Sequence, residues 1–70
     1  MIKKFNINDF VTTEDWTMKA IFLVDGHWVE GILEYKLKMH FLKVYDFRSD
    51  TFESAVSEII DKITNYIVLE

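Results

Sequence analysis

Val24-Asp25-Gly26-His27 separates two runs rich in apolar and aromatic residues, 17–24 and 27–47. Asp-Gly is favoured at the centre of a type I′ turn because both central residues need φ > 0, which glycine adopts freely and aspartate tolerates. The pair therefore predicts a two-residue β-hairpin with a strand on each side. The turn is therefore informative about the fold and does not indicate a catalytic or binding function.

The first run, 17–24, has the β-branched and aromatic content typical of a strand. Its even positions share one face: Met18, Ala20, Phe22 and Val24. Ile21 and Leu23 lie on the other face. We therefore expect both faces of this strand to be apolar near the turn.

The second run alternates between apolar and polar residues. Its odd positions are mostly apolar: Val29, Gly31, Leu33, Tyr35, Leu37, Met39 and Phe41. Polar residues occupy the even positions between them, with Ile32 as the exception: Glu30, Glu34, Lys36, Lys38 and His40. Period 2 favours a strand with one face inward. Because one strand over 27–47 is too long for so small a domain, we expect a turn between Glu34 and Met39. A helix over 35–47 stays open as an alternative, since Glu34 and Lys38 form a favourable i,i+4 pair.

Asp50-Thr51-Phe52-Glu53 has the pattern of a capping box, with Asp50 accepting from the Glu53 N–H. Apolar residues then recur at three- and four-residue steps: Phe52, Val56, Ile59, Ile60, Ile63 and Ile67. The spacing predicts an amphipathic helix over about 51–65. Residues 66–69 either extend this helix or form a short strand.

Residues 1–8 suit a short edge strand, followed by one helical turn around Phe10 and Val11. Residues 1–70 are expected to form a single small α+β domain. We predict an antiparallel sheet of three or four strands, with one C-terminal amphipathic helix packed on one face as a second layer.

Composition limits the classes of function. The 70 residues include no cysteine, half are hydrophobic, and the net charge is −4. No disulfide or zinc thiolate site is therefore possible, and no apolar run approaches the ~18 residues of a membrane span. We expect a cytoplasmic protein. The acidic balance disfavours nucleic-acid binding, because phosphate attracts basic surfaces.

The polar residues show no catalytic pattern. His27 and His40 have no nucleophile or orienting carboxylate at suitable spacing. Asp46 and Asp50 flank Arg48 without a third metal ligand. The only glycines, Gly26 and Gly31, do not form a phosphate-binding loop. We expect no enzyme, no metal site and no cofactor.

Surplus apolar surface is the strongest functional indication. One helix covers one face of a small sheet, so apolar residues on the other face need a partner or a cover made by residues 1–16. We predict a protein-binding module that occupies a surface of a larger protein, as small acidic inhibitor and accessory proteins of phages and mobile elements do. Its expected apolar anchors are Trp16, Trp28 and Ile32, with charge steering by Glu30, Glu34, Glu58 and Asp61.

Two alternatives come from other classes. A homo-oligomer would bury the same sheet face against its own copy. A single-stranded nucleic-acid binder would use Lys36, Lys38, Lys43 and His40 with Tyr35 and Phe41. However, we expect these aromatic residues to face inward and the lysines to face outward. An acidic row of Asp50, Glu53, Glu58 and Asp61 on the expected helix suits either a phosphate mimic or a solvated face.

Overall fold

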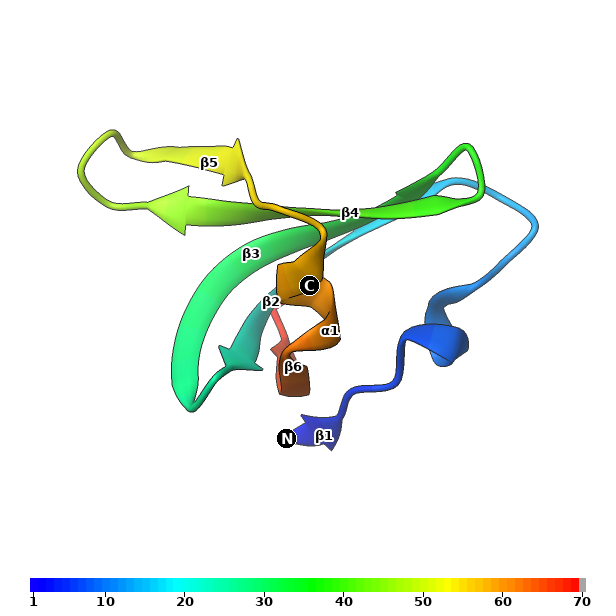
Figure 1. The fold of residues 1–70 in the computed structure, drawn as a ribbon, viewed down its shortest axis with the longest axis horizontal. Helices are drawn as coiled ribbons and strands as arrows, with labels where there is room; N and C mark the ends of the chain where they lie inside the picture. The colour runs from blue at the N-terminus through cyan, green and yellow to red at the C-terminus, as the bar shows by residue number, and fades with distance from the viewer. Residues whose placement is uncertain (70) are drawn as a thin grey trace.

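The computed structural model describes residues 1–69 and contains one six-stranded antiparallel sheet (Figure 1). The strand order is β1-β6-β2-β3-β4-β5, so the last strand lies between the first two. The strands are β1 (Lys3–Lys4), β2 (Trp16–Val24), β3 (His27–Lys36), β4 (Met39–Asp46), β5 (Thr51–Ser54) and β6 (Ile63–Val68). A 3₁₀ turn, η1 (Ile7–Phe10), and a one-turn helix, α1 (Glu58–Asp61), complete the described chain.

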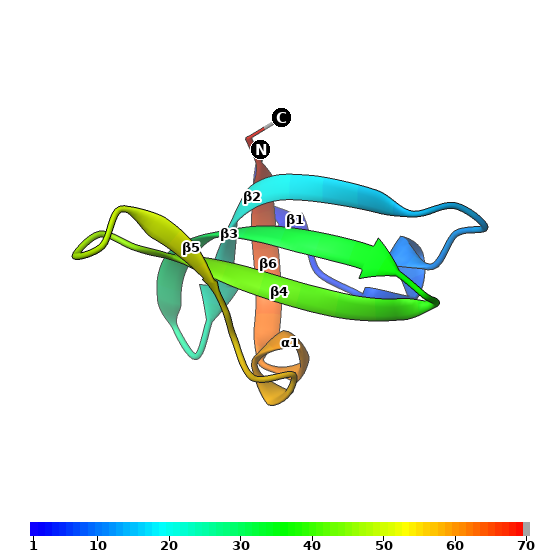
Figure 2. The same cartoon turned by 90° about the horizontal axis from the view of Figure 1, so that it is seen from above.

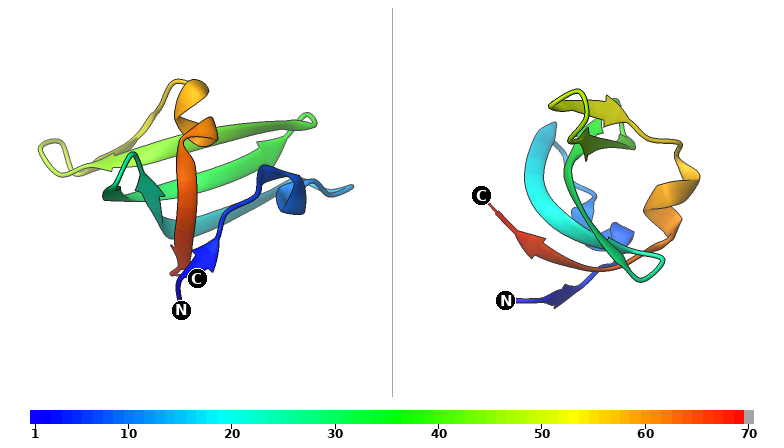
Figure 3. Two further views of the ribbon diagram at one scale, coloured as in Figure 1. Left: turned by 60° about the horizontal axis from the view of Figure 1, so that its bottom comes forward. Right: turned by 90° about the vertical axis from the view of Figure 1, so that its left-hand side faces the viewer.

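Seen from above, β6 runs across the direction of β3 and β4 (Figure 2). The sheet curls strongly into an open half-barrel, as the right-hand view of Figure 3 shows. Both η1 and α1 lie on its concave side, where the half-barrel would otherwise be open (Figure 3). Side chains of Ile7 and Phe10 from η1, and Ile60 from α1, pack against the core there. The concave side is therefore the inside of the domain, and the convex side is its outer surface.

The core is built from alternate residues of neighbouring strands. Phe22 and Leu33 are fully buried at its centre, and Ile60 and Ile63 pack against them from α1 and the start of β6. The face of 17–24 that carries Ala20 and Phe22 is the inward one, since both residues are 0% exposed. The predicted hairpin is confirmed: Val24 pairs with His27, and Asp25 and Gly26 have φ of 49° and 79°.

The predicted α+β fold of three or four strands and a C-terminal helix is wrong. Residues 51–65 form β5, the single turn of α1 and the start of β6 in place of a helix. Asp50 does not cap a helix, because it lies in the β4–β5 loop with φ of 56°. The segment is rich in β-branched residues such as Ile63 and Thr64, which lose side-chain freedom in a helix. Pairing with β4 and β2 satisfies its backbone and overrides the helical spacing.

Residues 35–47 are strand and turn, not helix, with the turn at Leu37 and Lys38 inside the predicted interval. The two-residue turn pairs Tyr35 with His40 and Leu33 with Leu42. Because directly paired residues share a face, the side chains that point inward belong to odd-numbered residues in β3 and to even-numbered residues in β4. The expectation that Met39 and Phe41 share the inward face is therefore wrong, and both lie on the convex side.

The Leu37–Lys38 turn is held in an unfavourable backbone conformation. Leu37 and Lys38 have φ of 53° and 58°, where an L-residue with a Cβ costs about 1–2 kcal/mol. We expect the double substitution Leu37→Asn, Lys38→Gly to stabilise the domain by roughly 1–2 kcal/mol, because Asn-Gly is the favoured type I′ pair. Urea unfolding should show a higher midpoint with an unchanged slope.

Gly26→Ala is the matched control for this turn prediction. No atom lies within 4 Å of a Cβ built on Gly26, so only its φ of 79° opposes the change. This variant should unfold at a lower urea concentration. An equal or lower midpoint for the Leu37→Asn, Lys38→Gly variant would contradict the assignment of strain to this turn.

Candidate functional site

The convex face carries an apolar patch near the β2–β3 turn. Trp28 pairs directly with Leu23, and Ile21 pairs directly with Ile67, so three neighbouring strands contribute to it. Ile21 and Leu23 are two residues apart on one strand and therefore share this face. We call the group the Trp28 patch: Ile21, Leu23, Trp28 and Ile67.

The Trp28 patch is uncovered in the part of the chain that the structure describes. The Trp28 side chain is 44% exposed, and the three aliphatic residues are half-buried. Figure 3 shows η1 and α1 on the opposite, concave side of the sheet. A tryptophan exposed beside aliphatic side chains has the large, rigid contact area that protein interfaces favour.

Ile32 lies in a different environment, among charges. Its direct cross-strand neighbours are Lys19 and Lys43. The Lys19 Nζ lies 3.7 Å from Glu30 Oε2, and the Lys43 Nζ lies 3.7 Å from Glu34 Oε1. The Lys19–Glu30 pair is exposed and contributes about 0–1 kcal/mol to stability, whereas the Glu34 side chain is only 16% exposed. The middle of the convex face is thus a charge-balanced zone, distinct from the apolar Trp28 patch.

Aromatic and hydrogen-bonding contacts stabilise the β4–β5 hairpin at one edge of the convex face. The Tyr45 and Phe52 rings lie 5.4 Å apart, and the Lys19 Nζ lies 5.5 Å from the centre of the Phe52 ring. The Tyr45 hydroxyl donates to Asp50 Oδ1 at 2.6 Å. This bond to a carboxylate, which favours the neutral phenol, raises the pKa of Tyr45 above its usual range.

Of the expected interface residues, four come together. Trp28, Glu30, Ile32 and Glu34 all lie on the convex face of β3. Trp16 lies on the concave face, because its even position continues the inward parity of Met18 and Ala20 in β2. Its ring centre is 5.7 Å from that of Phe10 and 6.0 Å from that of Tyr35, so Trp16 closes one end of the core.

Glu58 and Asp61 lie away from the convex face, in α1 on the concave side. Ile67 was not among the expected interface residues, because residues 66–69 were expected either to extend a helix or to form a short strand. The β-branched and aromatic content of residues 63–68, which is typical of a strand, was the signal that could have revealed Ile67.

Residues 1–16 do not cover the convex face. Phe5 packs edge-on against Phe22 of the core, with ring centres 6.2 Å apart. The Nε2 atom of His40 is 3.0 Å from the backbone oxygen of Phe10, which joins η1 to β4. The N-terminal segment therefore completes the concave side, and the cover considered as an alternative is absent.

The acidic row expected on a C-terminal helix is not formed. Asp50 and Glu53 belong to the β4–β5 hairpin, whereas Glu58 and Asp61 lie in α1. A four-residue helix cannot present a row of carboxylates that imitates a phosphate backbone.

The residues considered for nucleic-acid binding are divided between the two faces. Phe41 shares the convex face with Lys36 and Lys43, and the Lys36 Nζ lies 5.3 Å from the Phe41 ring centre. Tyr35 and His40 lie on the concave side, with ring centres 4.7 Å apart. Of the two aromatic residues considered for this function, Phe41 alone lies on the face that carries Lys36 and Lys43.

Within residues 1–69, no three His, Asp or Glu side chains gather closely enough to hold a metal ion. The same residues include no helix with the length and apolar character needed to cross a membrane. Comparison with protein-family models, curated proteins and solved structures gives no match to this chain.

Proposed function

We propose that this protein is a binding module that occupies a surface of a larger protein through the Trp28 patch. The observation that carries the proposal is Trp28 itself: it is 44% exposed, beside three half-buried aliphatic residues, on a sheet face that no other described element covers. Burying this apolar group against a partner removes it from water, and tryptophan is among the residues that most often dominate binding energy.

The surroundings of the Trp28 patch suit an interface. An apolar centre with a polar rim is the usual arrangement, and the ion pairs of Lys19–Glu30 and Lys43–Glu34 supply such a rim along β3. The domain exposes 5101 Å² in total. A standard interface, at about 800 Å² per partner, would use roughly a sixth of this surface. One face of the sheet is large enough for that contact.

Trp28→Ala tests the proposal. We expect this change to weaken capture of the partner by about tenfold or more, because truncating a central tryptophan costs about 2 kcal/mol or more of binding energy. Tagged protein is incubated with lysate of the source cells, and the retained proteins are quantified by mass spectrometry. Phe47→Ala is the control, since it removes another exposed aromatic ring outside the patch.

A partner retained by the unaltered protein and by Phe47→Ala, and lost with Trp28→Ala, supports the proposal. Equal retention by both variants contradicts it. Far-UV circular dichroism of each variant confirms that the sheet is intact, so that loss of binding is not loss of the fold.

A further inference from the structure

The tip of the β3–β4 hairpin exposes apolar and cationic side chains together. Leu37 lies between Lys36 and Lys38 and is 81% exposed. Met39 follows Lys38 and is 57% exposed. The other two-residue turn of the chain uses Asp25 and Gly26, which suit its backbone. The β3–β4 tip instead places an exposed leucine and a lysine at positive φ, so local stability does not explain its composition.

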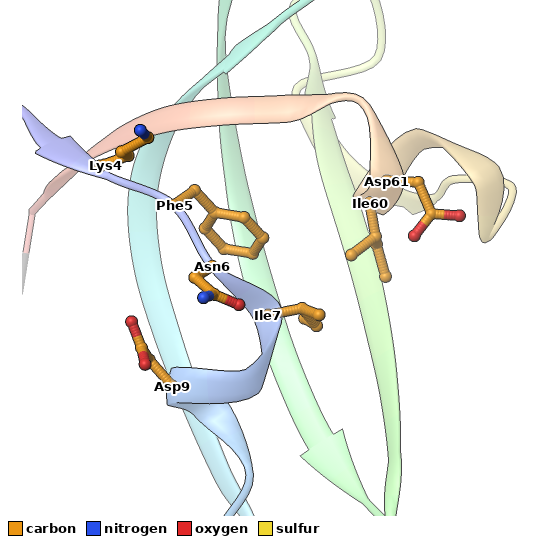
Figure 4. A pocket seen from close by; sticks show the side chains of 7 residues that line it. All are labelled: Lys4, Phe5, Asn6, Ile7, Asp9, Ile60 and Asp61. Carbon is orange, nitrogen blue, oxygen red and sulfur yellow. The ribbon is translucent and has the colours of Figure 1, made fainter.

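A groove of about 530 Å³ opens on the concave side, between the N-terminal segment and α1 (Figure 4). Apolar side chains of Phe5, Ile7 and Ile60 line it. The carboxylates of Asp9 and Asp61 stand on opposite sides of Ile7, one on η1 and one on α1. A single cation, Lys4, lies at the far end beyond Phe5.

We propose that the β3–β4 tip of one copy inserts into this groove of a second copy. The two surfaces match in both respects: the tip presents Leu37 and Met39 with two lysines, and the groove presents apolar side chains with two carboxylates. A volume of about 530 Å³ lies in the range of roughly 300–1,000 Å³ that is typical of small-ligand sites, which gives room for two aliphatic side chains.

The proposed contact joins different surfaces of the two copies. Neither Leu37 nor Lys38 lines the groove of its own molecule. The pair keeps one free tip on one copy and one free groove on the other, so such a contact extends into a chain or closes into a ring. The contact is small, which predicts a weak association with a dissociation constant on the order of 0.1 mM.

Other acidic surfaces fit the tip less well than this groove. An anionic membrane attracts each nearby lysine with about 1 kcal/mol, and the net charge of −4 opposes the approach of the whole domain. The groove supplies carboxylates and an apolar lining together, on a surface that is present wherever the protein is present. The inference goes beyond the proposed function, since it uses no residue of the Trp28 patch.

Sedimentation velocity over about 0.01–1 mM protein tests the proposal with two variants. The tip variant is Leu37→Asn, Lys38→Gly, which is expected to fold more stably than the unaltered chain. The groove variant is Asp9→Lys, Asp61→Lys, which reverses two exposed charges. We expect the unaltered protein to associate as its concentration rises and each variant alone to stay monomeric.

Mixing the two variants gives the decisive result. The tip variant keeps an intact groove and the groove variant keeps an intact tip, so the mixture should form a 1:1 dimer that grows no further. Raising the salt concentration to about 0.5 M should weaken this dimer, because exposed charge pairs are screened. Trp28→Ala should associate as the unaltered protein does, which separates this contact from pairing through the Trp28 patch.

Three results would overturn the proposal. The first is a monomer throughout the concentration range. The second is a mixture of variants that remains monomeric. The third is binding of the monomeric protein to phosphatidylserine vesicles that the tip variant loses, which would assign the tip to a membrane surface.

Discussion

Phe22→Ala is expected to remove roughly half of the free energy of unfolding of the domain, about 3–5 kcal/mol. Phe22 is 0% exposed at the centre of the core, where its ring packs edge-on against Phe5. Truncating a buried phenylalanine costs about 3–5 kcal/mol, through lost burial and the cavity left behind. A chain of this length has roughly 4–10 kcal/mol of stability in total, so one side chain carries much of it.

Val56→Ala is the matched control for Phe22→Ala, because Val56 is also apolar but 64% exposed. Urea unfolding followed by far-UV circular dichroism measures both. The control should keep the urea midpoint of the unaltered protein, while Phe22→Ala should unfold at a much lower urea concentration. If the two variants unfold at similar urea concentrations, the core is not centred where the structure places it.

Gly31→Ala should have the second largest effect, a loss of about 2–3 kcal/mol. A Cβ built on Gly31 lies 2.8 Å from the backbone oxygen of Lys43, and 3.3 Å and 3.4 Å from side-chain atoms of Phe22 and Leu42. The oxygen belongs to the neighbouring strand, so it cannot move away without disturbing the pairing of Gly31 with Val44. The missing side chain is therefore a requirement of the β3–β4 pair.

Gly26→Ala separates this steric effect from the flexibility of glycine. At Gly26 only the positive φ opposes a side chain, which costs about 1 kcal/mol. The free energy of unfolding should therefore fall more for Gly31→Ala than for Gly26→Ala. The reverse order would mean that β3 and β4 approach each other less closely at Gly31 than the structure shows.

The region from Trp16 to Lys36 could be predicted because local signals agree there. Asp25-Gly26 suits its turn, and alternation places Phe22 and Leu33 inward, as the structure shows. The same alternation placed Trp28 and Ile32 together on the outer face. It also places Trp16, an even-numbered residue of β2, on the inward face. This position does not agree with the interface role that was expected for Trp16.

The remainder could not be read from local sequence. Leu37 and Lys38 have no preference for a turn. The switch of the inward-facing residues from odd numbers in β3 to even numbers in β4 could therefore not be recognised from the sequence. Residues 51–65 have the apolar spacing of a helix, but they contribute to strands because β5 pairs with β4 and β6 pairs with β2, which is distant in sequence. Ile67 joined the Trp28 patch only once that pairing was known.

The position of β6 between β1 and β2 has a consequence for how the chain folds. Strands β2 to β5 follow one another as neighbours and form mostly local contacts, whereas β6 must close a long loop, pairing Val68 with Ala20. Loop-closure entropy makes such non-local pairing slow. Until residues 63–68 dock, the outer edge of β2 stays unpaired beside Ile21 and Leu23, and an open apolar edge favours aggregation. Folding yield should therefore depend on how quickly β6 docks, and a chaperone that shields β2 during that interval should raise it.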